Sequence, residues 1–171
     1  MENALAHIYS SPRERCLQTA RAFGEPLCLP IEVSDALDEF DFGSWTGKSI
    51  ASLEPENRWN RFNSARSQVS APSGESMTSV QQRVVSALKK WGDLHPAADI
   101  VAVTHAEPIR AALLYFMGRS LDDWGEVEIG EASVSVVEVN GTKYQVTQIN
   151  CPGSADLPAR IPMDAGEARR C

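Results

Sequence analysis

A histidine at position 105 lies where an apolar run gives way to a helical pattern, and this position suits an anion site. Residues 100–103 read IVAV, and residues 104–110 read THAEPIR ahead of a further apolar stretch. The pattern predicts a strand that ends beside His105, followed at once by a helix. The first turn of a helix leaves backbone N–H groups free, and phosphate is an anion that such a turn binds readily.

A second predicted strand-to-helix turn carries an arginine. Residues 10–20 read SSPRERCLQTA, with Ser11 expected as the N-cap and Pro12 as the first helical residue. Arg15 then falls in the first helical turn, where its planar guanidinium can hold two phosphate oxygens together. Arg13 is expected to point to another face. An isolated arginine of this kind would be read as a solvated helix residue.

The candidate acid is Glu39, which begins the segment EFDFGSWTG at residues 39–47. Cleavage of a phosphate ester requires a proton for the leaving alkoxide, and a carboxyl group beside apolar side chains can have its pKa raised for that task. Asp38 and Asp41 are rival acids in the same loop. Trp45 suits the lining of a pocket or the core equally well.

Taken in order, four segments of the chain resemble the histidine phosphatase superfamily, the phosphoglycerate-mutase-like enzymes. The match extends from about residue 6 to about residue 150, and its segments are residues 10–20, 39–47, 74–76 and 104–110. The resemblance implies that Arg15 binds phosphate and that His105 holds the phosphoryl group and stabilises its charge during transfer. It also implies that Glu39 is the proton donor. The Gly-Glu-Ser turn that contains Glu75 is expected simply to cap the long helix that follows it.

Two features depart from the family pattern. The nucleophile of the family is the histidine of an Arg-His-Gly motif, and none occurs here, where the histidines are His7, His95 and His105. We therefore expect the chain to begin late, by a strand-helix unit of roughly 30 residues or more. We also expect the 171 residues as written to show no appreciable phosphatase activity. Glu107 stands in a pair of positions where Gly-Gly is frequent, and its charge would repel phosphate if the side chain pointed inward.

The resemblance implies a phosphomonoester hydrolase that acts through a phosphohistidine intermediate on a small phosphorylated metabolite, with no metal and no other cofactor. Three alternatives remain open: a pseudo-phosphatase that binds phospho-ligands without catalysis, a phosphoglycerate mutase-type phosphotransferase, and a decaying fragment. The short connection over residues 64–74 favours a phosphatase over a mutase.

Composition narrows the class of protein further. A net charge of -7 argues against nucleic-acid or acidic-membrane partners. The four cysteines lack metal-ligand spacing, and Cys16 is expected to be a buried thiol. No apolar run approaches the length of a membrane span, and Met1-Glu2-Asn3 is unlike the start of a signal peptide, so a cytoplasmic location is predicted. A homodimer remains open.

Strands that alternate with helices predict an α/β three-layer sandwich with a mostly parallel sheet and a C-terminal β-hairpin. Residues 1–150 are expected to form one domain, incomplete at its N-terminus, and residues 151–171 a disordered tail. The expected strands are 5–9, 31–33, 99–104, 134–139 and 144–149, the last two joined at Asn140-Gly141 as an antiparallel edge of the sheet. The expected helices are 12–23, 48–65 with a break near Pro55, 76–94 and one from Pro108 to about Gly118, with a loop over 35–47.

Overall fold

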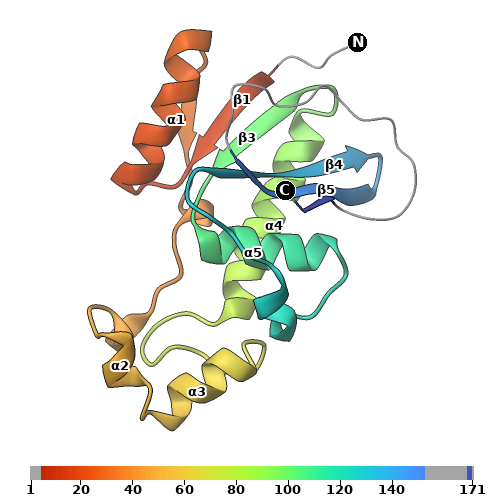
Figure 1. Cartoon of the computed structure of the whole chain (residues 1–171). Helices are drawn as coiled ribbons and strands as arrows, with labels where there is room; N and C mark the ends of the chain where they lie inside the picture. The colour runs from red at the N-terminus through yellow and green to blue at the C-terminus, as the bar shows by residue number, and fades with distance from the viewer. Residues whose placement is uncertain (1–4, 153–168, 171) are drawn as a thin grey trace.

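A parallel sheet of three strands positions the candidate residues (Figure 1). The computed structural model describes residues 5–152 and 169–170. The strand order is β2-β1-β3, so the first strand lies between the other two. Ser10 pairs with Val103 in the register of β1 and β3, so both strands end at the same edge of the sheet. The bounds are β1 Leu5–Ser10, β2 Ile31–Val33 and β3 Asp99–Val103.

Helices cover both faces of this sheet and confirm the predicted three layers (Figure 1). One face packs against α1 (Glu14–Leu27). The other face packs against α4 (Met77–Leu94) and α5 (Ala106–Phe116), with the Tyr9 ring of β1 stacked 3.9 Å from that of Trp91. The prediction of the long amphipathic helix is confirmed, and Ser76 caps it by accepting from the Ser79 backbone N–H at 3.0 Å.

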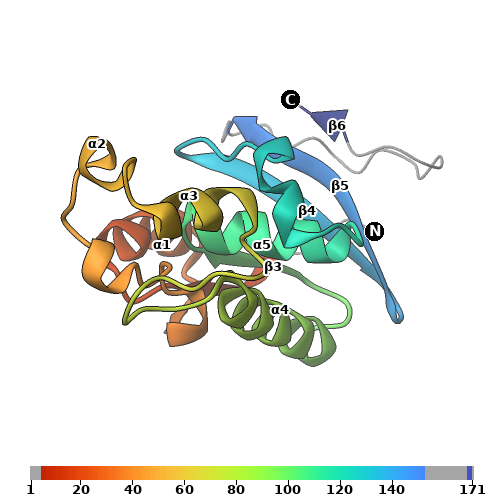
Figure 2. The same ribbon diagram turned by 90° about the horizontal axis from the view of Figure 1, so that it is seen from below.

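The C-terminal hairpin forms a sheet of its own, which corrects the expectation that it would extend the parallel sheet. Figure 2 shows β4 and β5 beside α5, away from α4. α5 is apolar on more than one side, so it needs a second cover, and the hairpin supplies it by stacking Tyr144 on Phe116 at 5.0 Å. The turn comprises residues 141–142, one position later than predicted. The bounds are β4 Ser133–Asn140, β5 Lys143–Pro152 and β6 Arg169–Arg170.

The first helix differs from the prediction at both ends. It begins at Glu14 with Arg13 as its N-cap. The hydroxyl of Ser11 accepts from the backbone N–H of Arg13 at 3.3 Å and is also engaged with His105 and Asp38. It continues past Gly24 and Pro26 to Leu27. Gly24 lets the chain after the helix pack closely against it, since a Cβ there would lie 3.1 Å from the carbonyl oxygen of Leu29.

The chain between β2 and α4 forms a lobe of short elements beside the main layers (Figure 1). Its aromatic side chains join the main hydrophobic core: Trp45 is buried and its ring lies 5.4 Å from that of Phe62, so Trp45 is a core residue. The predicted break near Pro55 is confirmed, and the predicted loop over 35–47 contains two short turns of helix. The bounds are η1 Asp35–Leu37, η2 Gly43–Trp45, α2 Ile50–Leu53, α3 Asn57–Ser64 and, after α5, η3 Leu121–Glu126.

Most of the expected tail, residues 153–168 and 171, lies outside the described residues. Four positions of it do have regular structure, since residues 151–152 complete β5 and residues 169–170 form β6 along Gln148 and Ile149. Within the described ranges, no helix is long and apolar enough to cross a membrane.

Candidate active site

The strand register brings the two predicted turns together. β1 and β3 are adjacent and parallel, and the backbone N–H of Ser11 donates to the carbonyl of Val103 at 2.9 Å. The helices that follow, α1 and α5, therefore begin side by side at one edge of the sheet, where α/β folds place their ligands. Arg15 and His105 lie on these two helix starts and are in direct contact.

His105 is buried, with 6% of its surface exposed. Its neighbours determine which ring nitrogen carries the proton. Nε and Nη2 of Arg15 lie 3.1 and 2.8 Å from its Nδ1. A guanidinium only donates, so Nδ1 accepts and the imidazole proton resides on Nε2. Nε2 then donates to Oγ of Ser11 at 2.8 Å. Burial, followed by the positive charge of Arg15, lowers the pKa of His105 to about 4.

Arg15 presents the accessible part of the site. Its side chain is 64% exposed, and Nη2 also lies 3.8 Å from Oε2 of Glu39. Arg13 behaves differently: it forms a two-pronged pair with Asp38, at 2.6 and 2.9 Å. Arg13 is thus separate from the contact with His105, as expected, but it is held by Asp38 and is not simply solvated.

Glu39 and Asp38 are neighbouring carboxyls with opposite pKa shifts. Burial, reinforced by the charge of Glu107, raises the pKa of Glu39 although the Phe40 backbone N–H donates to it at 2.9 Å. Burial also acts to raise the pKa of Asp38, but the hydrogen bond from Arg13 and that from the Glu39 backbone outweigh it, and the pKa is lowered. Glu39 is therefore the carboxyl better suited to carry a proton, and Asp38 stays ionised.

The loop that carries Glu39 is braced by the segment around Glu75. Arg83 donates to both carboxylate oxygens of Glu75, at 3.0 and 3.1 Å. Arg83 also donates to the carbonyls of Ala36 and Glu39, at 2.9 and 3.1 Å. The carboxylate of Glu75 accepts from the backbone N–H of Asp41 at 3.0 Å. The Gly-Glu-Ser turn caps α4 as expected, through Ser76, and Glu75 itself holds the loop.

Two glycines allow these segments to touch. A Cβ on Gly74 would lie 2.3 Å from the carbonyl oxygen of Asp41, and one on Gly43 would lie 2.2 Å from that of Pro72. Both distances are far inside van der Waals contact with backbone atoms. Gly43 also has a positive φ of +53°, which favours glycine. The GES turn and the EFDFG segment therefore form one interlocked unit.

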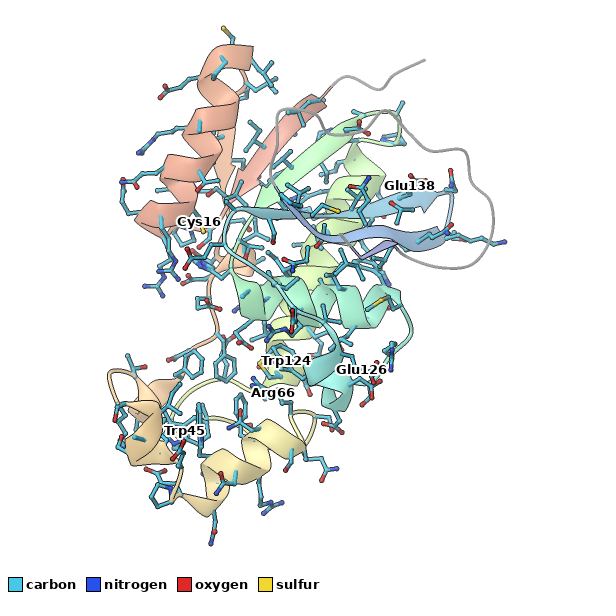
Figure 3. All side chains as sticks on the ribbon, in the orientation of Figure 1. Cys16, Trp45, Arg66, Trp124, Glu126 and Glu138 are labelled. Atoms are coloured by element: carbon cyan, nitrogen blue, oxygen red, sulfur yellow. The ribbon has the colours of Figure 1, made fainter. Side chains whose placement is uncertain are left out.

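Sequence reasoning missed three contributors to the site. Ser11 was expected as a cap, but its hydroxyl bonds His105 and lies 3.4 Å from Oδ1 of Asp38. Cys16 is buried as expected, at the start of α1 (Figure 3), but its Sγ also lies 3.5 Å from Nε2 of His105. Arg83 gave no local signal, because its partners lie up to 47 residues away. The sequence signal that could have pointed to Ser11 is the serine pair before Pro12.

Glu107 does not face the phosphate-binding groups directly. Its Oε2 lies 3.2 Å from Nη1 of Arg66, and its Oε1 lies 3.7 Å from Nη1 of Arg110. Two arginines thus share this one carboxylate. Among the described residues, no group of three or more His, Cys, Asp or Glu side chains could hold a metal ion.

Comparison with known proteins agrees with this geometry. The sequence profile of the histidine phosphatase superfamily, branch 1, matches residues 1–152. Phosphoserine phosphatase 1 of Hydrogenobacter thermophilus is 29% identical over 146 residues, which are 84% of this chain and 69% of that protein. A bifunctional protein of Mycobacterium tuberculosis is 30% identical over 139 residues, which are 78% of this chain and 37% of that protein.

A solved structure gives the same result for the fold. The structure of Bacillus stearothermophilus YhfR superposes with a TM-score of 0.79 at 27% identity, covering 88% of this chain and 75% of that one. The profile match spans most of the 171 residues, and the motifs at residues 10–20 and 104–110 follow the ends of two adjacent parallel strands. The chain belongs to branch 1 of the histidine phosphatase superfamily.

Proposed function

We propose that Arg15, His105 and Glu39 bind the phosphoryl group of a small phosphorylated metabolite, as the binding half of a phosphomonoester hydrolase site. One observation supports this above the others: Oε2 of Glu39 lies 3.8 Å both from Nη2 of Arg15 and from Nδ1 of His105. A cation, a neutral imidazole and a carboxyl of raised pKa thus surround one point at the edge of the sheet.

Binding would rearrange the contact between Arg15 and His105. The phosphate oxygens would take the guanidinium donors that now point at Nδ1, since a planar fork matches two of these oxygens. The freed Nδ1 could then accept a proton and donate to the phosphate. In ester cleavage, the proton of Glu39 would pass to the bridging oxygen as its bond to phosphorus breaks.

Among the described residues, the candidate nucleophiles near the site are not activated for attack on phosphorus. His7 and His95 stack on one another with ring centroids 3.9 Å apart, and His95 also bonds the Tyr9 hydroxyl. Ser11 accepts from His105 and donates to Oδ1 of Asp38 at 3.4 Å, and the lowered pKa of that carboxyl makes it a weak base. Burial raises the pKa of the Cys16 thiol, which keeps it protonated at neutral pH.

The 171 residues contain no Arg-His-Gly motif. We therefore propose that they bind a phosphomonoester and form no phosphohistidine at such a motif. The lack of an activated nucleophile among the described residues also supports the pseudo-phosphatase alternative, in which the chain binds the ligand without turnover. The phosphoserine phosphatase among the relatives makes a phosphorylated small molecule the first ligand class to examine.

Titration of the full chain with inorganic phosphate, measured by calorimetry, tests the binding site. We expect Arg15→Ala to weaken binding at least roughly tenfold, because a charge-assisted contact contributes about 1.5–3 kcal/mol. Arg21→Ala is the matched control, since Arg21 lies on the same helix and, among the described residues, pairs with Glu14 alone, at 3.4 Å. Equal affinities of the two variants would overturn the proposal.

Turnover of an aryl phosphate tests the statement about the nucleophile. We expect none from the purified chain. Turnover that persists in Arg21→Ala and disappears in His105→Ala would show that His105 is itself the nucleophile and that its role has been misassigned.

A further inference from the structure

A cavity lies along one side of α3, on the lobe beside the main layers. Its volume is about 470 Å³, which falls within the range of roughly 300–1,000 Å³ that is typical of small-molecule sites. Side chains of the helix and of the chain that follows it line the cavity: Asn57, Arg58, Arg61, Gln68, Val69 and Ser70. None of these residues is part of the candidate active site.

The two arginines of this cavity have no negative partner among residues 5–152. Nε of Arg58 donates to the carbonyl oxygen of Ser70 at 3.0 Å, the single hydrogen bond of this guanidinium within that range. The guanidinium of Arg61 has neither a hydrogen bond nor an ion pair there. Every other arginine of residues 5–152 meets a carboxylate within 3.8 Å. In a chain with 23 Asp and Glu against 16 Lys and Arg, the lack of a counter-ion is thus specific to this cavity.

The cavity gathers hydrogen-bond donors. Arg58 and Arg61 lie three positions apart on α3, so their exposed side chains share one face of the helix and their charges repel each other. Asn57 and Gln68 add amide groups that have no side-chain hydrogen bond in the described part of the chain. The lining contains no carboxylate. An anion with several acceptor oxygens would satisfy these donors and remove the repulsion.

The cavity lies on the side of α3 that is turned away from α5. Oδ1 of Asn63 accepts from Nη2 of Arg66 at 3.1 Å, and Arg66 meets Glu107 of α5 at 3.2 Å. Residues two positions apart on an α-helix point about 200° apart, so Arg61 projects from the opposite side of α3 to Asn63. Figure 1 also shows α3 at the bottom of the lobe and α1 at the opposite end of the view. A ligand in the cavity would therefore be separate from one in the candidate active site.

We propose that this cavity binds the phosphate group of a small metabolite at Arg58 and Arg61, as a second site that goes beyond the proposed function and does not depend on it. A phosphate monoester carries close to two negative charges at neutral pH, and these match the two unpaired guanidinium groups. Each planar guanidinium can hold two phosphate oxygens together. A single carboxylate would leave one positive charge unbalanced. The cavity is larger than a phosphate group, so it has room for the organic part of such a ligand.

Titration of the full chain with inorganic phosphate at constant ionic strength, followed by ¹⁵N NMR, tests the second site. Arg15→Ala keeps the two sites apart, because it removes the cation of the candidate active site and leaves the cavity intact. We expect the backbone signal of Val69 and the Nε signal of Arg61 to shift and saturate in the wild type and in Arg15→Ala alike. Sodium chloride in place of phosphate should leave both signals unmoved.

Arg61→Met should weaken the phosphate binding reported by Val69 at least roughly tenfold. This substitution removes no internal contact of the guanidinium within the described residues, so the variant should fold. Arg21→Met is the matched control, because Arg21 is an exposed arginine of α1 that pairs with Glu14.

Three results would overturn the second site: a Val69 signal that phosphate does not move, one that it moves only when Arg15 is present, and one that it moves equally in Arg61→Met and Arg21→Met. Shifts of the same signals with a hexaglutamate peptide, and none with phosphate, would assign the cavity to an acidic peptide instead. Phosphate binding at Val69 with none that depends on Arg15 would overturn the proposed function and support this inference.

Discussion

Nη2 of Arg15 lies 2.8 Å from Nδ1 of His105, and this contact makes the imidazole neutral. A guanidinium cannot accept a proton, so Nδ1 has to offer its lone pair and the ring proton is confined to Nε2. The site without a ligand is therefore internally satisfied. Any anion that binds here must compete with His105 for Arg15, and the following predictions depend on that relationship.

Acid should destabilise the protein through His105. Its folded-state pKa of about 4 lies below the ordinary value of 6.5, so the unfolded chain binds the proton more tightly. Its contribution to the free energy of unfolding is fully present above pH 6.5 and is lost as the pH falls towards 4, with a total of roughly 3 kcal/mol. Urea unfolding at several pH values measures it. His105→Gln should lack this part of the pH dependence, and identical profiles for variant and wild type would contradict the assignment.

Removal of Arg15 should raise the pKa of His105. The charge of Arg15 is the second largest cause of the lowered value, after burial. NMR titration of the His105 ring protons in Arg15→Ala should show the increase, and Arg21→Ala should leave the pKa in place. Phosphate added to the wild type should also raise it, because the anion stabilises an imidazolium. An unchanged pKa in Arg15→Ala would show that burial alone determines the shift.

Glu39 should titrate above Asp38 although the two are adjacent. Burial and the charge of Glu107 raise the pKa of Glu39, whereas the bonds from Arg13 and the Glu39 backbone lower that of Asp38. Carboxyl ¹³C NMR should show this order, and Glu107→Gln should lower the pKa of Glu39. The exposed Glu126 provides the control variant Glu126→Gln, which should have no effect. The reverse order of titration would make Asp38 the candidate acid.

An alanine at position 74 should loosen the loop that carries Glu39. Its Cβ would lie 2.3 Å from the Asp41 carbonyl oxygen, so the two segments would have to separate. We expect a loss of about 1–3 kcal/mol in urea unfolding. Gly125→Ala is the control, because no atom of the described part of the chain lies within 4 Å of a Cβ there. Similar stabilities for both variants would show that the interlock is not needed.

Much of the architecture follows from signals that are local in the sequence. The apolar period over residues 77–94, the runs before Ser11 and Thr104, and the turn chemistry near Gly141 each involve residues within a few positions of one another. They predicted the long helix, the strands and the hairpin. They also placed Arg15 and His105 at strand ends, and two adjacent parallel strands bring such positions together.

Partnerships between distant side chains were decided only by the tertiary structure. The hydroxyl of Ser11 meets His105, 94 residues away, a contact that no local pattern predicts. Arg66 meets Glu107 across 41 residues, which no local pattern encodes. The opposite pKa shifts of Asp38 and Glu39 likewise depend on the groups that packing brings to each carboxyl. Local sequence determines where a side chain leaves the backbone, but burial and the charges around it arise only when separate elements pack, and these determine its chemistry.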